Sequence, residues 1–534
     1  MRNEKLRYIS RSAHVLFFTF YAVAAASEGL ESGLCVFNPR DFGAAGDGHT
    51  VDTAAIQAAI DACALEGGGR VYLDTGTFVS GTLILKDNVT LYVEAGSTLL
   101  GSDNLDHYPD ITPNLFYLYT HRFTRYLIYA EKARNIGIMG PGTIDGRGRA
   151  FPYVRDDDKG RPYIIRFVEC SNVTVRDVTF LDSARWLQHY LACENVVIDG
   201  ISVVAKTREN RDGIDIDSCD DVRISNCRIE SGDDAIVLKA TAERPCRRVA
   251  VTNCIVSSGA SALKLGTESN GGFEDIVFSN CVVFDTQGDG IAIEMVDGAG
   301  LERVVFSNIV MRNVRVPIFI RLGNRARPMP DREPPGMGTL RNVTVTNIQA
   351  SGVGPLGCSI TGLPGHPAEH ITLSNIRLEF AGGGTLEDAA AEVPERAEAY
   401  PSGRMFGTLP AYGFYVRHVR GIDMRGIHLD YAEPEFRPAF VFDDATHVNL
   451  SGLCAEIDPE ARSFISFRDV RHALINGCAP LGATDTFLAV QGDSGSVALI
   501  GNDLTHVNGD VHLGANVPED AVQIGLNVES KSEQ

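Results

Sequence analysis

A short apolar motif recurs through most of this chain of 534 residues. Each copy pairs a polar or small residue with an alternating apolar run, and the apolar partner falls at Val173, Val196, Val222, Val249, Ile276 and Val304. The steps between these positions are 23, 26, 27, 27 and 28 residues. The motif continues at Val343, Ile371, Val448, Leu474 and Val497. A repeat of nearly constant period predicts a solenoid, in which each unit stacks on its neighbours.

The residues within each unit indicate which kind of solenoid forms. The units are rich in Val, Ile, Thr and Gly, which favours strands over helices. A second ladder is expected to be structural, with side-chain amides that hydrogen-bond from unit to unit. Its members are Asn226, Asn253, Asn280, Asn308 and Asn347. The sequence therefore predicts an all-β fold, a right-handed single-stranded parallel β-helix, whose handedness follows the general rule for crossover connections.

One solenoid domain is predicted over residues 36–525, because a solenoid grows by adding turns and needs no second core. Two insertions interrupt the repeat, a Pro-rich one near 325–339 and a longer one near 380–414. Near the start, apolar residues at helical spacing over 52–65 predict a short helix that caps the open first turn. Asp52 is the expected N-cap of that helix.

The two ends of the chain differ from the repeat. Residues 1–27 combine a basic start, an apolar run too short to span a bilayer, and small residues suited to cleavage. This pattern predicts a signal peptide, and with it a secreted or periplasmic protein. The last residues, 526–534, are expected to form a disordered tail.

Charge and cysteine content narrow the possible partners. The net charge of −21 argues against nucleic acid and anionic membranes as partners. Several of the 12 cysteines share repeat positions, which is typical of small buried hydrophobes stacked along a solenoid. No Cys/His pair has zinc-ligand spacing, so no structural metal is expected. We expect a monomer that acts on a polysaccharide or oligosaccharide.

Three acids carry the candidate chemistry. Asp212 lies about one repeat before Asp233 and Asp234, so stacking of the repeats should bring the three carboxyl groups together. Crowded carboxylates resist ionising together, and one of them then keeps its proton near neutral pH. A protonated and an ionised carboxyl side by side are the groups that cleave a glycosidic bond. The nearby Asp215, Asp217, Asp220 and Asp221 are expected to be exposed charges at strand edges.

Several segments resemble a known family. Residues 37–48, with the Gln57-Ala58-Ala59-Ile60 run, resemble the N-terminal signature of pectin-acting β-helix enzymes. The Asn210-Arg211-Asp212 and Gly232-Asp233-Asp234 motifs resemble those of the polygalacturonase family, glycoside hydrolase family 28, and Trp186 and His189 fit the same pattern. The resemblance implies a pectin-lyase-like solenoid and an inverting glycosidase without a cofactor. It also implies that Asp233 is the general acid and that Asp212 and Asp234 orient and activate water.

The chain departs from that family at two motifs. The usual Gly-His-Gly aligns with Ala260-Ser261-Ala262, and the usual Arg-Ile-Lys clamp for a uronate aligns with Ala292-Ile293-Glu294. Neither Ala nor Glu can replace charge-assisted hydrogen bonds to a carboxylate. We therefore expect plain polygalacturonate to be a poor substrate, and another pectic or plant-wall glycoside to be cut from its chain end. The expected substrate-binding residues are Asn210, Lys239, Lys264, Glu268, Glu294 and Arg321.

Some roles stay open at the level of sequence. Trp186 suits a core position as well as a sugar platform, and His189 is equally ambiguous. Strand alternation puts Lys264 opposite its flanking leucines, so we expect an exposed lysine that faces the cleft. The insertion near 380–414 is expected to reach back and wall one end of the cleft, which favours exo action. A β-helix polysaccharide lyase or epimerase that uses calcium, and a non-catalytic carbohydrate-binding protein, remain alternatives.

Overall fold

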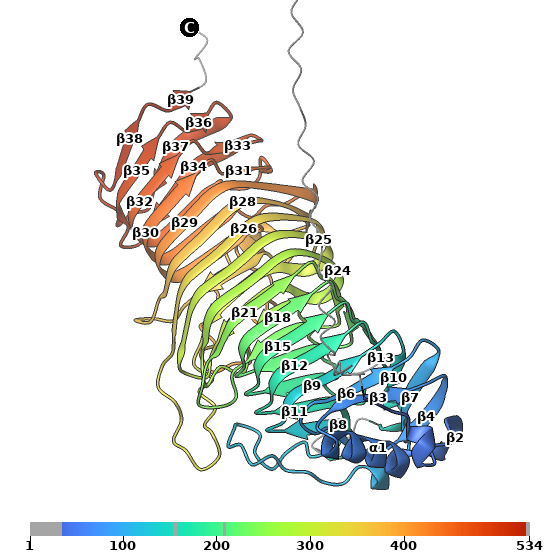
Figure 1. Ribbon diagram of the computed structural model, residues 1–534. Coiled ribbons are helices and arrows are strands. Elements are labelled where there is room, and N and C mark those ends of the chain that lie inside the picture. The colour runs from blue at the N-terminus through green and yellow to red at the C-terminus, as the bar shows by residue number, and fades with distance from the viewer. Residues whose placement is uncertain (1–34, 153–158, 207–209, 530–534) are drawn as a thin grey trace, which may run out of the picture. The chain divides into compact units, whose positions relative to one another are not determined.

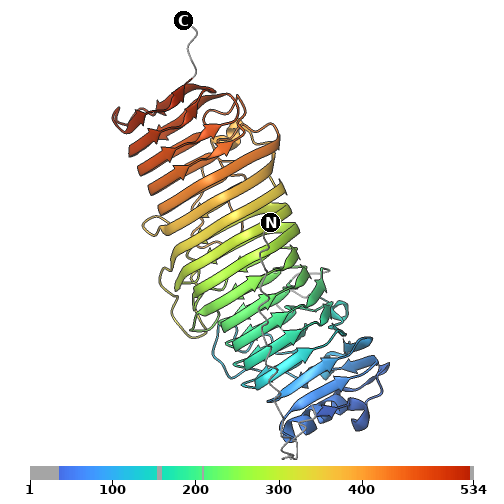
Figure 2. The ribbon, with the colours of Figure 1, turned by 45° about the horizontal axis from the view of Figure 1, so that its top comes forward.

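The computed structural model describes residues 35–152, 159–206 and 210–529. The predicted signal peptide over 1–27 lies outside the described residues. From Cys35 onward the chain forms one compact unit. Within it, strands from successive turns pair side by side and in parallel in one 37-stranded sheet that winds into a coil (Figures 1 and 2). This is the right-handed parallel β-helix that the repeat predicted.

Three ladders of strands form the faces of the coil, and each turn after the first contributes one strand to each ladder up to β23. Ladder A contains β5 (Leu83–Ile84), β8 (Tyr126–Glu131), β11 (Tyr163–Val168), β14 (Gln188–Leu191), β17 (Ile214–Asp217), β20 (Ile236–Lys239) and β23 (Leu263–Leu265). Ladder B contains β1 (Val36–Phe37), β3 (Gly69–Leu73), β6 (Val89–Val93), β9 (Arg134–Met139), β12 (Ser171–Arg176), β15 (Glu194–Asp199), β18 (Asp220–Ser225) and β21 (Cys246–Thr252). Ladder C contains β2 (Asp47–Val51), β4 (Gly76–Ser80), β7 (Ser97–Gly101), β10 (Thr143–Asp145), β13 (Thr179–Leu181), β16 (Ser202–Ala205), β19 (Arg228–Ser231) and β22 (Ile255–Ser258).

In the later turns, single long strands bend through more than one ladder. These strands are β24 (Phe273–Met295), β25 (Gly300–Leu322), β26 (Thr339–Val353), β28 (Ala368–Gly382), β29 (Phe414–Glu433), β30 (Phe440–Ser451) and β32 (Ile465–Asn476). Shorter strands complete the last turns: β27 (Cys358–Thr361), β31 (Cys454–Ala455), β33 (Ala479–Pro480), β34 (Thr484–Gln491), β35 (Gly495–Ile500), β36 (Asp503–Leu504), β37 (Val507–Leu513), β38 (Val522–Gly525) and β39 (Val528–Glu529).

The apolar row read from the sequence is the core row of ladder B. Val173 pairs with Val196, which pairs with Val222, and the row continues through each later turn. One position was assigned wrongly: Ala473, not Leu474, continues the row beside Val448, and Leu474 points outward. Because strand side chains alternate between faces, a shift of one residue exchanges a core position for a surface position. One rung was also missed, at Ile422 after the second insertion.

The polar positions that precede the core row lie at the corners of the coil. Asn172, Asn195 and Asp221 have φ values of 55°, 53° and 56°, in the left-handed region. Asn and Asp enter this region more readily than other non-glycine residues, which accounts for their recurrence at the corners. The second ladder occupies another corner, where Asn308 Nδ2 donates to Asn280 Oδ1 at 3.0 Å and Asn347 Nδ2 donates to Asn308 Oδ1 at 2.8 Å. These bonds confirm the predicted amide ladder from Asn280 onward, whereas Asn280 itself donates to Thr252 Oγ1 and not to Asn253.

The expected capping helix is α1 (Thr53–Leu65), which packs its apolar side chains against the first turns. Asp52 occupies the N-cap position, but its side chain does not cap the helix. Its carboxylate instead accepts the N–H groups of Ala45 at 2.7 Å and Gly46 at 3.0 Å, which fixes the preceding loop. No helix within the described residues is long and apolar enough to cross a membrane.

The remaining elements lie in the insertions and at the chain end. Three short 3₁₀ helices, η1 (Pro39–Phe42), η2 (Leu105–His107) and η3 (Gly148–Ala150), occupy loops of the early turns. The interruption near 325–339 joins β25 to β26, and the one near 380–414 joins β28 to β29 and contains α2 (Leu386–Ala389). In the segment expected to be a disordered tail, Val528–Glu529 pairs with β36, while residues 530–534 lie outside the described part.

Candidate active site

The three candidate acids lie on neighbouring turns at the start of ladder A strands. Asp212 precedes β17, while Asp233 and Asp234 precede β20, and the Gly213 N–H donates to the Asp234 carbonyl at 2.9 Å. One oxygen from each of the three carboxyl groups lies within 4.8 Å of the others. The turns can approach this closely because residue 213 is glycine. A side chain at this position would place its Cβ only 2.5 Å from the Ala235 carbonyl oxygen.

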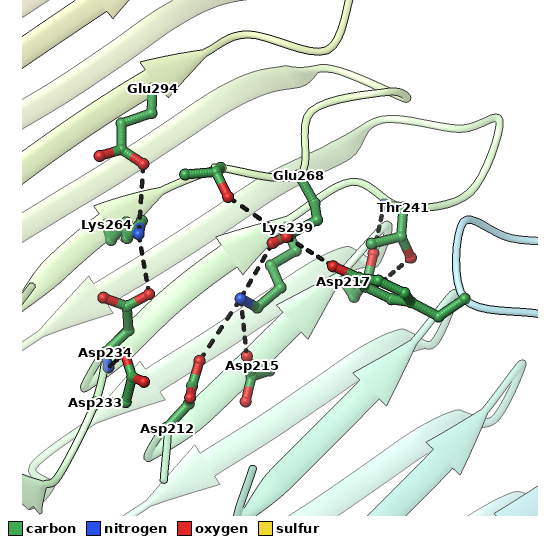
Figure 3. Close-up of polar contacts among 12 residues, drawn as sticks. Asp212, Asp215, Asp217, Asp233, Asp234, Lys239, Thr241, Lys264, Glu268 and Glu294 are labelled. Carbon is green, nitrogen blue, oxygen red and sulfur yellow. Dashed lines mark hydrogen bonds and ion pairs between the residues drawn. The ribbon is translucent and has the colours of Figure 1, made fainter. Parts of the chain in front are cut away.

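Two buried lysines on the same ladder form ion pairs with two of these acids (Figure 3). Lys239 Nζ lies 3.6 Å from Asp212 Oδ2, and also contacts Asp215 and Glu268. Lys264 Nζ lies 3.0 Å from Asp234 Oδ2 and 3.4 Å from Glu294 Oε2. The charged forms of Asp212 and Asp234 are therefore each stabilised by an adjacent ammonium group.

Asp233 has a different environment. It forms no ion pair within the described part of the chain. Its carboxylate accepts the backbone N–H of Asn210 at 2.9 Å and that of Asp234 at 3.0 Å. Burial raises the pKa of Asp233, and the charge of Asp234 raises it further. Of the three acids, Asp233 is also the one with partial solvent exposure, so a proton held there can reach a substrate.

More carboxyl groups surround the triad than the sequence indicated. Asp215 and Asp217 have no exposed surface and Asp220 is buried, so their expected exposure was wrong, and only Asp221 is exposed. Burial raises the pKa of Asp215 to about 8. Burial, followed by the charges of Asp215 and Asp233, raises the pKa of Asp212. The site therefore concentrates acids at low solvent access, which favours uptake of protons.

Lys264 is on the predicted side of its strand but is not exposed as predicted. Its flanking leucines belong to the core, and the lysine points away from them, yet its residue exposure is only 3%. Lys264 Nζ lies 5.8 Å from the ring centroid of Tyr400, which belongs to the second insertion. The covering of Lys264 thus comes from a segment more than a hundred residues away, which strand alternation cannot reveal.

Glu268 is held by three donors from three parts of the chain. It pairs with Lys239 at 3.3 Å, accepts the Tyr119 hydroxyl at 2.8 Å and pairs with Arg327 at 2.9 Å. Tyr119 comes from the loop before β8, and Arg327 from the Pro-rich insertion. Through these bonds Glu268 joins the two loops to the site. Its expected contact with sugar hydroxyls stays a prediction.

The other expected substrate-binding residues also have partners within the protein. Arg321 donates to Thr361 Oγ1 at 3.2 Å and to the carbonyls of Gly362 at 3.0 Å and Glu395 at 2.7 Å. The side-chain oxygen of Asn210 accepts from Arg161 at 3.1 Å. Arg321 thereby anchors the second insertion, and Asn210 positions Asp233 through its backbone.

Glu294 lies on the turn after Lys264 and is almost fully buried. Burial raises its pKa to about 8, although the charge of Lys264 opposes this. Ala292, the other residue at the position of the missing clamp, pairs with Lys264 across the ladder. The place where the family clamp would lie is therefore flanked by two cations, Lys264 on the turn before and Arg321, which pairs with Glu294 across the ladder, on the turn after.

The second insertion runs back over these turns. The Gly403 N–H donates to Asp289 Oδ2 at 3.1 Å, and the Asn324 N–H donates to the Ala397 carbonyl at 2.7 Å. Burial raises the pKa of Asp289 to about 6. The Tyr400 side chain beside Lys264 remains well exposed, with 61% of the residue accessible. The insertion therefore adds an aromatic ring to the site, and neither Tyr400 nor Asp289 lies in a motif that the sequence could mark.

Trp186 and His189 lie just before β14 and within it, respectively, on the turn before Asp212. Trp186 packs in a cluster with Tyr119 and Tyr163, and Lys239 Nζ lies 4.3 Å from its ring centroid. His189 is fully buried between Arg166, which donates to Nδ1, and Asp217, which accepts from Nε2 at 3.0 Å. Both residues are buried, and Trp186 stabilises the Lys239 ammonium group by a cation–π contact.

The triad is also the one group of acids within the described residues whose spacing suits a metal ion. Carboxylate oxygens are the ligands that calcium prefers. Lys239 and Lys264 already neutralise two of the three carboxylates, however, and their ammonium groups would repel a cation at this position.

Two family models match successive segments of the coil. A family model described as glycosyl hydrolases family 28 matches residues 111–398, more than half of the chain. A second model, described as rhamnogalacturonase A/epimerase, pectate lyase-like, matches residues 36–106. The first match contains all three acids of the triad.

Individual relatives agree with these families. A Vitis vinifera protein named "Probable polygalacturonase" is 33% identical over 213 residues, which cover 38% of this chain and 43% of that protein. The exo-poly-alpha-D-galacturonosidase of Dickeya chrysanthemi is 30% identical over 254 residues, or 38% of this chain and 42% of that protein. The chain thus spans less than half the length of these two relatives. The crystal structure of a hyperthermoactive exopolygalacturonase from Thermotoga maritima superposes with a TM-score of 0.59 at 22% identity, covering 74% of this chain and 92% of that one.

Proposed function

Because the chain belongs to family 28 of the glycosyl hydrolases, we propose that it hydrolyses a glycosidic bond in a pectic or related plant-wall polysaccharide or oligosaccharide. The observation that carries this proposal is the triad of Asp212, Asp233 and Asp234, three close carboxyl groups of which two have lysine partners and one does not. Such an arrangement supplies one proton donor and two proton acceptors at the same place.

The proposed mechanism divides these roles by environment. Asp233 gives its proton to the glycosidic oxygen, so the leaving sugar departs as an alcohol. Asp212 and Asp234 hold a water molecule and accept its proton as the oxygen bonds to the anomeric carbon. Asp212 Oδ1 has no hydrogen-bond partner among the described residues, which leaves it available to that water. Lys239 and Lys264 each place an ammonium group beside one of these acceptors, which favours its charged form.

We further propose that the reaction inverts the anomeric configuration, as membership of the family implies. In inverting glycosidases the two carboxyl groups are usually roughly 6.5–9.5 Å apart. The nearest oxygens are closer, within 4.8 Å. Oxygens at this spacing can share one water molecule, so we assign the water to the pair formed by Asp212 and Asp234. Proton NMR of the first-formed anomer tests this step, and a retained anomer would instead indicate a covalent intermediate on one aspartate.

We propose exo action on the basis of the second insertion. Residues 395–403 bond to Arg321 and Asp289 and bring Tyr400 over Lys264, so this segment limits how far a chain can extend along ladder A. Replacing residues 392–402 with a short Gly/Ser linker should convert release of single sugars into release of longer products. The exposed substitution Glu387→Gln in the same insertion is the control. Unchanged product sizes from a folded linker variant would show that the insertion does not set the mode of cleavage.

The substrate is proposed to differ from plain polygalacturonate at the subsite of the missing clamp. Ala292 offers no charge there, and Lys264 is already paired with Asp234 and Glu294. A lost charge-assisted hydrogen bond weakens binding by about 1.5–3 kcal/mol. Incubation with polygalacturonate, rhamnogalacturonan and short pectic oligosaccharides, with products separated by size, should give a single monosaccharide from one of the latter two. Efficient cleavage of polygalacturonate would mean that Lys264 already binds the uronate.

The same incubation separates hydrolysis from elimination. A lyase would release unsaturated products that absorb in the ultraviolet, and its activity would depend on calcium. Saturated products in the presence of a chelator support hydrolysis. Sequencing the N-terminus of protein recovered outside the cytoplasm tests the predicted signal peptide, and sedimentation of the purified chain tests the proposed monomer.

A further inference from the structure

A pocket lies on the ladder that also carries the active site, several turns further along the chain, and the second insertion lines part of it. This ladder continues from Arg321 through Thr361, Arg417, Asp443 and Arg468 to Gln491, each paired with the next. The pocket has a volume of about 460 Å³ and lies over the last turns of this series. It shares no lining residue with the triad, so it is separate from the site described above.

The pocket is lined by both apolar and polar side chains. The second insertion contributes apolar residues, through Leu386 and Ala389 of α2 and the residues that follow them. The strands of the coil and their loops contribute Arg462, Arg468, Gln491 and His512. A sugar ring presents a C–H face and a rim of hydroxyl groups, so lining residues of these two kinds match its two surfaces.

The two arginines of the pocket outnumber its one lining carboxylate that has no cationic partner among the described residues. Asp443 is engaged by Arg417 at 3.2 Å and by the Tyr415 hydroxyl at 3.1 Å. Asp485 accepts from the neutral amide of Asn508 at 3.1 Å, which does not neutralise a carboxylate. Neither Arg462 nor Arg468 forms an ion pair with any described residue, and both are exposed. Two guanidinium groups without carboxylate partners favour a ligand that brings its own carboxylate.

We propose that this pocket is an accessory binding site for a uronate-containing oligosaccharide. The inference rests on the proposed function in one respect, the choice of a pectic polymer as ligand. Uronates alternate or recur along pectic chains. The volume is within the range of small-molecule sites and accommodates one or two sugar rings. Arg462 and Arg468 bind the carboxylate, Gln491 and His512 bind hydroxyl groups, and Leu386 packs on the ring. Such a site holds a polymer near the active site while chain ends are hydrolysed.

Binding is tested directly with digalacturonate, measured by calorimetry on the Asp233→Asn protein so that no turnover occurs. Galactobiose, which lacks the carboxylates, is the neutral probe. We expect digalacturonate to bind and the Arg468→Ala substitution to weaken it by at least about tenfold, as loss of a charge-assisted hydrogen bond predicts. The same substitution at Arg377, an exposed arginine on a different ladder, is the matched control and should change nothing.

A second variant tests the pocket without touching its charge. Ala489 is a half-buried lining residue, and Ala489→Trp should fill the space and abolish binding of digalacturonate while the melting temperature stays near that of the parent. Binding that survives both Ala489→Trp and Arg468→Ala would lie in the active site and would overturn the proposal. Equal affinity for galactobiose would overturn the assignment of a uronate. Because the readout is binding, a failure of the hydrolase proposal leaves this result interpretable.

The pocket should also affect catalysis in a way that depends on substrate length. If the protein hydrolyses pectic chains, Arg468→Ala should raise KM for a polymer several-fold and leave kcat/KM for a disaccharide unchanged. A fall in activity on the disaccharide as well would indicate that the substitution disturbs the active site through the second insertion, and would count against a separate accessory site.

Discussion

The same stacking geometry produces two very different polar columns in this protein. At one corner of the coil, Asn280, Asn308 and Asn347 lie on successive turns and bond through their side-chain amides. On ladder A, Asp212 and the pair Asp233 and Asp234 also lie on successive turns, but as buried carboxyl groups. The amide column is exposed, and Asn308 both donates to Asn280 and accepts from Asn347. Ionised carboxylates only accept hydrogen bonds and repel one another. The carboxyl column therefore depends on nearby lysines and on bound protons to offset this repulsion.

The difference shows which polar repeats indicate structure and which indicate function. An amide carries both a donor and an acceptor, so a stack of amides satisfies itself. Like charges at this distance in a buried site are costly unless paired or protonated. Such a column is costly to the folded chain, and groups of this kind cluster at functional sites, which is why we propose proton transfer as its role.

The largest expected effect is on catalysis by the carboxyl column. Asp233→Asn removes the proton donor, and because general acid catalysis contributes roughly 10²–10⁴-fold, turnover of a substrate with a poor leaving group should fall by that factor. The fold should remain intact, as circular dichroism and the melting temperature would show. Asp221→Asn, the same change at an exposed corner of the preceding turn, is the control and should retain full activity. A rate for Asp233→Asn above about a tenth of wild type would reject the assignment.

The second effect concerns the stability of the same column. Lys264→Met removes the ammonium group between Asp234 and Glu294 and leaves two buried acids without it. Breaking a buried pair in this way typically lowers the free energy of unfolding by about 3–5 kcal/mol. Lys132→Met breaks the exposed pair with Glu169 and should lower it by no more than about 1 kcal/mol. Denaturant unfolding measures both, and equal losses would mean that Lys264 is effectively solvated.

Most of the coil could be predicted from the sequence because its signal is periodic. The core row at Val173, Val196 and Val222 and the corner asparagines repeat with each turn, and stacking alone brings Asp212 beside Asp233. Where the repeat weakens, the prediction was wrong: at Leu474 the alternation was misplaced by one residue. Periodicity therefore determines the strands and their stacking, but not every register.

The covering of the site could not be predicted in the same way. Asp215 and Asp217 face outward from ladder A, as strand alternation suggests, but loops cover that face. Tyr119 reaches Glu268 across 149 residues of sequence, and Arg327 reaches Tyr119 across 208. Contacts at such separations follow no period, so the burial that raises the pKa of Asp215 leaves no pattern in the sequence.

A third, smaller effect is the dependence of stability on pH. In the folded protein the pKa of Glu294 is about 8, whereas an unfolded glutamate ionises near pH 4.3, so the folded state holds an extra proton between these values. Stability should therefore fall as pH rises through this window, by up to about 1.4 kcal/mol per pH unit. Glu294→Gln cannot ionise and should remove this contribution, so its stability relative to wild type should increase from pH 5 to pH 8. The exposed Glu387→Gln serves as control, and parallel pH profiles for wild type and Glu294→Gln would contradict the raised pKa.

The smallest effect should be at the amide column. Asn308 has a φ of 55° and takes part in two ladder bonds. Glycine adopts this left-handed conformation readily, so Asn308→Gly removes only the side-chain bonds. Exposed hydrogen bonds of this kind contribute about 0.5–1.5 kcal/mol each, and water replaces part of the loss, so unfolding should become easier by about 1 kcal/mol. Asn308→Ala adds the strain of a left-handed alanine, about 1–2 kcal/mol, and should be the less stable of the two. Activity should not change in either variant, because the corner lies on another ladder from the triad. A loss in Asn308→Gly as large as that in Lys264→Met would show that the amide column supports the coil far more than its exposed bonds suggest.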